Sequence, residues 1–105
     1  MDTTLTDLLI DAVRDDNSHG IIGLLQQGAN PNGTLDQDGL TPLCFALTKN
    51  RVKIIQILLA AGADIHLYIP GYECTILDYA ISTQRTNIVN LLLQSINTIN
   101  KDYIK

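Results

Sequence analysis

Apolar side chains in the middle of the chain follow the spacing of two short helices. Leu43, Ala46 and Leu47 stand at i, i+3 and i+4, which puts them on one face of a helix. A second apolar stretch covers residues 54–59, and Gly62 follows it as a helix-ending residue. The pattern therefore predicts a unit of two consecutive helices in this part of the chain.

The residues at the ends of these helices have the chemistry of caps and turns. Thr41 is a good N-cap, and Pro42 suits the first helical position, where its missing N–H costs nothing. Asn50 tolerates the left-handed conformation that reverses the chain between the helices. Neither helix reaches the ~12–15 residues that an isolated helix needs in water, so both must pack on neighbours.

The same pattern returns along the chain at a spacing of 34 residues. Thr41 and Thr75 are 34 positions apart, as are Gly28 and Gly62. Several columns that share one period indicate internal repeats, and three units fit the length of the chain. The apolar columns are Leu9, Leu43 and Leu77; Ala12, Ala46 and Ala80; and the pairs Leu24–Leu25, Leu58–Leu59 and Leu92–Leu93.

The central unit resembles an ankyrin repeat. Its sequence Asp38-Gly39-Leu40-Thr41-Pro42-Leu43 matches the family pattern D-G-x-T-P-L, and the segments 54–59 and 62–65 follow at conventional spacing. The resemblance covers the chain from about Leu5 to Asn100. It implies an all-α fold, a solenoid of helix-turn-helix units joined by β-hairpin fingers. The expected single domain, 1–105, divides into repeats at about 1–34, 35–68 and 69–100 and a C-terminal tail, 101–105.

Three departures from the family pattern carry structural expectations. The period of 34 exceeds the family value of 33 by one residue, which should lengthen the finger. Asp7 stands where the later units have the capping Thr, and we expect it to act as the N-cap of the first helix. Gly20 and Gly23 fall in the second helix, at about 1 kcal/mol each relative to Ala, so the first unit should be the softest.

The two ends of the array differ in polarity. Phe45 and Tyr79 should pack against the preceding unit, whereas Asp11 in the same column has no preceding unit and gives a polar end. At the other end, residues 88–93 keep the apolar pattern of an interior unit. Something should cover part of that face: the tail, self-association, or the rest of a longer natural chain. The apolar residues of the tail are Ile99, Tyr103 and Ile104.

Composition and charge exclude several classes of protein. With 46% hydrophobic and 17% charged residues, the chain is neither disordered nor of low complexity. A net charge of −4 argues against binding nucleic acid or anionic membranes. The chain has no basic segment after Met1 of the kind that begins a secretory signal, and we expect the two scattered cysteines to be reduced thiols. We therefore expect a cytoplasmic monomer, or one in a host cytosol if the protein is a secreted effector.

Candidate chemistry is sparse. The chain has no phosphate-binding glycine motif, and its two histidines are His19 and His66. His66 and Cys74 lie near one finger, but two ligands do not make a zinc site, and no third group would orient them as a nucleophile pair. Cys44 reads as a small buried apolar residue. The sequence predicts no metal, no cofactor and no enzymatic activity.

The remaining signal is the surface of the fingers and first helices. The finger at 66–74 carries Tyr68 and Tyr72, and exposed tyrosines are enriched in binding hot spots. The leading interpretation is a non-enzymatic module, an adaptor or an inhibitor, that binds another protein with a basic rim. The alternative is an N-terminal structural or targeting array of a longer protein whose activity lies in a further domain. The positions expected to continue the surface are Leu40, Gln37, Asp38, Thr48, Lys49 and Ser82.

Overall fold

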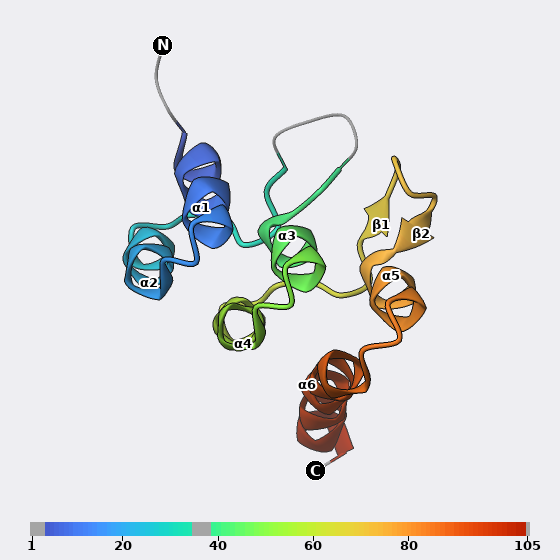
Figure 1. Cartoon of the computed structure of the whole chain (residues 1–105). Coiled ribbons are helices and arrows are strands. Elements are labelled where there is room, and N and C mark those ends of the chain that lie inside the picture. The colour runs from blue at the N-terminus through green and yellow to red at the C-terminus, as the bar shows by residue number, and fades with distance from the viewer. Residues whose placement is uncertain (1–3, 35–38, 105) are drawn as a thin grey trace.

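Short helices arranged in consecutive pairs make up most of the protein. The computed structural model describes residues 4–34 and 39–104, with side chains described as far as Ser95. The helices pair in chain order, α1 with α2, α3 with α4 and α5 with α6, and one hairpin precedes α5 (Figure 1). The elements are α1 (Leu5–Arg14), α2 (Ser18–Gln26), α3 (Pro42–Thr48), α4 (Val52–Ala60), β1 (Tyr68–Ile69), β2 (Cys74–Thr75), α5 (Ile76–Ser82) and α6 (Thr86–Ile104).

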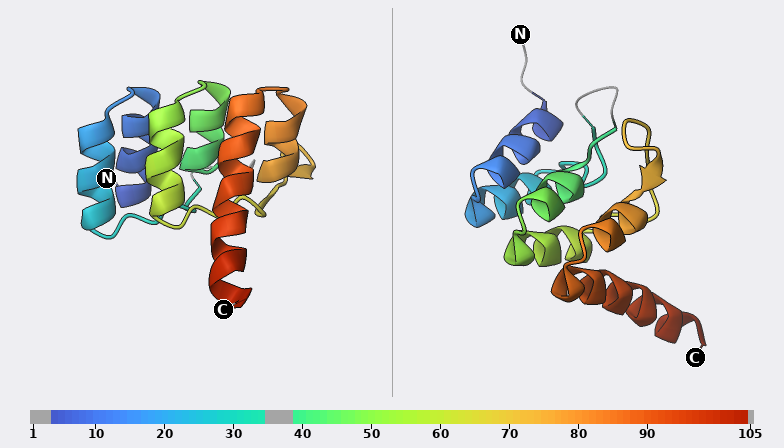
Figure 2. Two further views of the ribbon diagram at one scale, coloured as in Figure 1. Left: turned by 90° about the horizontal axis from the view of Figure 1, so that it is seen from below. Right: turned by 45° about the vertical axis from the view of Figure 1, so that its right-hand side comes forward.

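The three helix pairs stack side by side into a short solenoid. One layer consists of α1, α3 and α5, and the second layer consists of α2, α4 and α6 (Figure 2). Between units, α1 packs on α3, α2 on α4 and α4 on α6. The predicted solenoid of helix-turn-helix units with a β-hairpin finger is confirmed.

The repeat is visible in the backbone conformation as well as in the side chains. Asn50 has a φ of 56°, which confirms the left-handed turn predicted between the two helices of the central unit. Asp16 and Gln84, 34 residues before and after it, have φ values of 57° and 59°. Gly28 and Gly62 end α2 and α4 with φ values of 99° and 98°. The turns at corresponding positions of successive units therefore have the same left-handed backbone conformation.

Helix α6 departs from this pattern because its column has no glycine. The residue 34 positions after Gly62 is Ile96, and a β-branched residue is strongly disfavoured at positive φ. The backbone stays helical as far as Ile104, so α6 has 19 residues where α2 and α4 have nine each. Its C-terminal part extends past the ends of α2 and α4 (Figure 2). The side chains expected to cover the last repeat, those of Ile99, Tyr103 and Ile104, lie outside the described ones.

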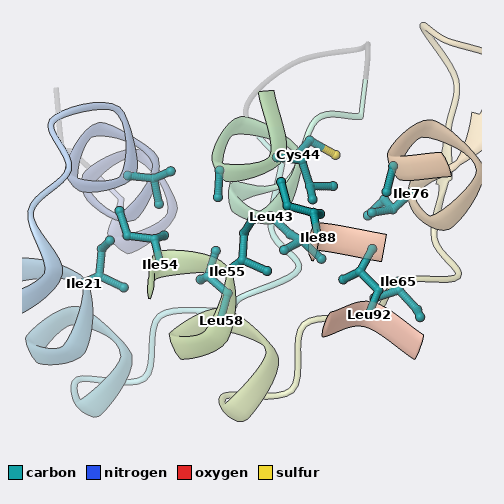
Figure 3. Packing of buried hydrophobic residues seen from close by; sticks show 14 of the residues in the cluster. Ile21, Leu43, Cys44, Ile54, Ile55, Leu58, Ile65, Ile76, Ile88 and Leu92 are labelled. Atoms are coloured by element: carbon teal, nitrogen blue, oxygen red, sulfur yellow. The ribbon is translucent and has the colours of Figure 1, made fainter. Parts of the chain in front are cut away.

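The core runs the length of the solenoid as one cluster. Leu43, Ile55 and Leu58 of the central unit are fully buried. Figure 3 shows Ile55 of α4 between Ile21 of α2 and Leu92 of α6. No helix could bury its apolar face within its own unit alone, which is why neighbouring units share the cluster.

The start of α1 corrects one prediction. The N-cap is Thr4, three residues before the predicted cap Asp7. The Thr4 hydroxyl accepts from the Asp7 N–H at 3.1 Å, and the Asp7 carboxylate accepts from the Thr4 N–H at 3.1 Å. Asp7 thus sits inside the helix as the second half of a capping box. The prediction was wrong because the alignment to Thr41 assumed one helix start for all units.

The caps of α3 and α5 also differ in detail. Thr75 accepts from the Asp78 N–H at 3.1 Å, as an N-cap should. Thr41 holds the same backbone position, but its buried hydroxyl lies 3.5 Å from the Cys44 sulfur instead of bonding to the backbone. The cap of α3 therefore combines Pro42 at the first turn with a hydroxyl–thiol contact.

The hairpin before α5 is short and anchored at its base. β1 and β2 are antiparallel, with Ile69 opposite Cys74 and Tyr68 opposite Thr75. Ile69 is fully buried, and its carbonyl accepts from the Glu73 N–H at 2.8 Å. This buried residue fixes the finger to the solenoid and leaves its turn in solvent.

Candidate functional site

A side-chain contact recurs between successive units on the layer that carries the finger. The guanidinium of Arg14 lies 4.7 Å from the centre of the Phe45 ring. One repeat later, the Thr48 hydroxyl lies 3.0 Å from the Tyr79 hydroxyl. Both contacts join a residue at the end of one first helix to the aromatic residue of the next. The predicted packing of Phe45 and Tyr79 on the preceding unit is confirmed.

Tyr79 connects the finger to the helices behind it. Its ring centre lies 5.3 Å from that of Tyr72, with the two planes inclined by 38°. Its carbonyl accepts from the Ser82 hydroxyl at 2.6 Å. Three of the residues expected at a binding surface, Thr48, Tyr72 and Ser82, are thus brought together around Tyr79. The contact between Thr48 and Tyr79 was not predicted, although the sequence carries a signal for it, the 31-residue step that also separates Arg14 from Phe45.

The two finger tyrosines are the most exposed aromatic residues whose side chains are described. Tyr68 is 58% exposed and Tyr72 48% exposed. Tyr68 alternates with the buried Ile69 along β1, so the pleat directs it away from the core. Tyr72 lies in the hairpin turn between β1 and β2 and is supported on one side by Tyr79. The finger therefore carries one ring, Tyr68, that is directed into solvent and a second ring, Tyr72, that packs against Tyr79. We call Tyr68, Tyr72, Tyr79, Thr48 and Ser82 the tyrosine surface.

The other expected residues have different surroundings. Lys49 is exposed at the end of α3. Leu40 is half-buried and packs against the core, so only part of its side chain is available to a partner. Gln37 and Asp38 lie outside the described residues. Gly39, next to them, comes close to the finger, because a Cβ there would lie 2.5 Å from the Pro70 ring.

A cleft of about 360 Å³ lies where the loop after α4 meets Asn32 of the first unit and Ser95 of α6. Asn32 crosses it, donating to the Gly62 carbonyl at 3.2 Å and accepting from the Asp64 N–H at 2.8 Å. His66 lines it and is exposed, and the backbone N–H of His66 donates to the Asp64 carboxylate at 2.8 Å. These bonds hold loops together, which gives the polar groups of the cleft a structural role.

The two cysteines are free thiols in different environments. Cys44 is buried in α3, as expected, and burial raises the pKa of its thiol while the contact with Thr41 partly opposes that rise. Cys74 is half-buried in β2. Within residues 4–34 and 39–104, no three His, Cys, Asp or Glu side chains gather as a metal ion would need. No helix in that part of the chain is both long and apolar enough to cross a bilayer.

Comparison with known proteins agrees with the repeat architecture. The family model for ankyrin repeats (three copies) matches residues 9–103. A stretch of 41 residues is 51% identical to the Ankyrin repeat and LEM domain-containing protein 1 homolog of Caenorhabditis elegans. The stretch represents 39% of this chain and 6% of that protein. The similarity to this relative therefore concerns a small segment of a much longer protein.

Proposed function

The chain belongs to the ankyrin-repeat family, and we propose that it is a non-enzymatic module that binds a partner protein through the tyrosine surface. Ankyrin repeats are generally protein–protein interaction modules. The proposal assigns that role to the finger β1–β2 and the adjoining ends of α3 and α5. An adaptor and an inhibitor would both use such a surface.

The observation that carries the proposal is the exposure of Tyr68 and Tyr72 on an anchored finger. Large rings with few rotatable bonds lose little conformational entropy on binding. Tyr72 is already held by Tyr79 at 5.3 Å, so part of the ordering has taken place before the partner arrives. A buried Ile69 beneath them keeps the finger from moving away.

Charge around the finger favours a partner with basic residues at the edge of its interface. Glu73 is exposed next to Tyr72, and Asp78 is exposed at the first turn of α5. The chain as a whole carries a net charge of −4. Such a potential increases the association rate with a positively charged surface. We place the interaction in the cytoplasm, on the ground that both cysteines are free thiols.

The test is a pull-down followed by measurement of affinity with Tyr68→Ala, Tyr72→Ala. The wild-type chain selects a partner, which mass spectrometry identifies, and calorimetry then compares the variants. We expect the double substitution to weaken binding by ~2 kcal/mol or more, as the loss of hot-spot residues does. The control is Ile22→Ala, which shortens a 40% exposed apolar side chain on α2, in the layer away from the finger.

Folding must be shown to survive the double substitution. Tyr72 contacts Tyr79, so we expect a loss of stability of about 0.5–1.5 kcal/mol, the range of an aromatic pair. A folded double variant that binds the partner with wild-type affinity would place the interface elsewhere and reject the proposal.

A second candidate function is that the array positions an activity carried by a further domain. The observation in its favour is the relative from Caenorhabditis elegans, in which the matched segment is 6% of a protein whose name includes a LEM domain. The mass of the endogenous protein decides between the two. A native mass of 11.5 kDa would reject the second candidate.

A further inference from the structure

Leu8 and Ile81 are exposed apolar residues at opposite ends of the solenoid, and the residues in their columns are buried in the other two units. Val13 and Leu47 are 0% and 1% exposed, yet Ile81, the next member of the column, is 50% exposed. The following unit reaches this column directly, because Arg85 of the third unit donates to the Leu47 carbonyl at 2.6 Å. Ile81 therefore has the apolar side chain of an interior position, although no further unit follows it within the described residues.

The opposite end shows the complementary situation. Pro42 and Ile76 occupy one column at the start of the first helices and are both buried. Leu8 precedes them by one period and is 41% exposed. Beside it, between α1 and α2, lies a recess of about 410 Å³ whose walls include Ala12, Gly20 and Leu24. The first unit thus has an apolar residue and a recess on the face where each later unit meets its predecessor.

We propose that two copies of this chain associate head to tail, with the N-terminal face of one on the C-terminal face of the other. The N-terminal face consists of Leu8, Asp11 and the recess between α1 and α2. The C-terminal face consists of Ile81, Ser82, Gln84 and Leu93, the last 42% exposed. The contact continues the unit–unit interface that already exists twice within the chain.

Polar residues on the two faces are compatible with this arrangement. Position 82 follows Arg14 and Thr48 in its column, and position 11 precedes Phe45 and Tyr79. The junction therefore sets the Ser82 hydroxyl opposite the Asp11 carboxylate, where the internal junctions have Arg14–Phe45 and Thr48–Tyr79. The Ser82 hydroxyl donates to the Tyr79 carbonyl within α5 at 2.6 Å, so this column gives Asp11 a neutral neighbour rather than a hydrogen bond.

A second polar column gives the same result. Arg51 of the second unit pairs with Asp16 of the first at 3.4 Å. The corresponding residues at the junction are Asn17 of one copy and Gln84 of the other, two amides that can bond to each other. Neither column places like charges opposite each other.

The proposed contact joins two different faces, so it is heterologous and can propagate beyond a dimer. One helix pair stacked on another falls at the small end of specific interfaces, below about 1,200 Å², and we expect weak association. This departs from the expectation of a monomer made above. It shares Ser82 with the tyrosine surface and leaves the two exposed finger residues, Tyr68 and Tyr72, available to a partner.

Sedimentation equilibrium over a range of concentrations provides the first test. The weight-average mass of the wild-type chain should rise above 11.5 kDa with concentration. Leu8→Asp and Ile81→Asp should each hold the mass at the monomer value, because either change puts a charge into the junction. Ile22→Asp is the matched control, since Ile22 is 40% exposed and its column-mates Gln56 and Asn90 are exposed. It should associate like the wild type.

Mixing the two variants provides the decisive test. A Leu8→Asp copy keeps its C-terminal face and an Ile81→Asp copy keeps its N-terminal face. The mixture should form a 1:1 complex of twice the monomer mass and grow no further. Circular dichroism of each variant alone, with a wild-type spectrum, shows that the monomers are folded.

Three results would overturn the proposal. A wild-type mass that stays at 11.5 kDa at every concentration would show that neither face binds a second copy of the chain. Association that persists in either single variant would show that another surface is used. A mixture that remains monomeric would exclude head-to-tail contact.

Discussion

Two glycines in the same short helix differ sharply in their surroundings. A Cβ added to Gly20 would lie 2.5 Å from the Asn17 side chain, which accepts from the Gly20 N–H at 3.0 Å and so caps α2. A Cβ added to Gly23 would meet no heavy atom within 4 Å. The first glycine leaves room for the cap, whereas the second weakens the helix and provides no contact in return. The sequence predicted both as equal costs, because a cap contact cannot be read from spacing.

Gly23→Ala should therefore stabilise the protein. The added methyl group fits in open space, and alanine has the higher helix propensity, so we expect the free energy of unfolding to rise by about 0.5–1 kcal/mol. Urea unfolding followed by circular dichroism measures the change. Gly20→Ala is the matched comparison and should show no such gain, since it displaces Asn17. Equal gains from both substitutions would show that the cap contributes nothing.

Cys44 should be slow to react and should make stability depend on alkaline pH. Burial raises the pKa of its thiol above the ordinary value of 9.0, so the folded chain holds this proton more tightly than the unfolded chain. This stabilising effect is fully present below pH 9.0 and is lost as the pH rises above it. Mass spectrometry after brief alkylation should find Cys74 modified before Cys44. Equal rates for both thiols would show that α3 opens freely, and Cys44→Ala should flatten the alkaline decline in stability.

At the scale of elements, helix ends decide how the units differ. Spacing predicted the helix pairs, the turn at Asn50 and the end of α4 at Gly62, because each depends on local residue types. The start of α1 was missed, since Thr4 and Asp7 form a capping box that the later units lack. The length of α6 follows from Ile96 standing where a glycine would be required, a signal that becomes visible once the positive-φ positions are known.

Helix α2 should open more readily than α4. It contains two glycines and, within the described residues, belongs to the unit with a neighbour on one side only. We expect the amide hydrogens of residues 21–25 to exchange faster than those of residues 54–59, as in a terminal unit with few buried contacts. Hydrogen exchange measured by NMR gives both values in one experiment, and Gly23→Ala should narrow the difference. Equal protection would mean that packing compensates for the glycines.

At the scale of the whole molecule, the candidate site was predictable in its members but not in their contacts. Tyr68, Tyr72, Thr48 and Ser82 could be proposed because finger and first-helix positions face outward in this family. The contact of Tyr79 with Thr48 depends on how one unit is placed against the next, which no local pattern encodes, whereas its contacts with Tyr72 and Ser82 lie within seven residues of it. The solenoid has few such links, because each unit contacts its neighbours only. The contribution of a single contact between units to the cooperativity of unfolding should therefore be measurable.

Arg85 provides the clearest test of coupling between units. Its guanidinium donates to the Leu47 carbonyl at 2.6 Å and so ties the third unit to the second. Arg85→Ala removes a hydrogen bond from a charged donor and leaves a carbonyl without it, which should cost about 1.5–3 kcal/mol. All four tyrosines of the chain lie from residue 68 onward, so tyrosine fluorescence reports on the finger and the chain after it, while circular dichroism reports on every helix. In the wild type the two urea transitions should coincide, and in Arg85→Ala the fluorescence transition should come first.

The control is Lys53→Ala, which removes an exposed cation from α4 and should leave the fluorescence and dichroism transitions coincident. Coincident transitions in Arg85→Ala would show that apolar packing alone couples the last two units.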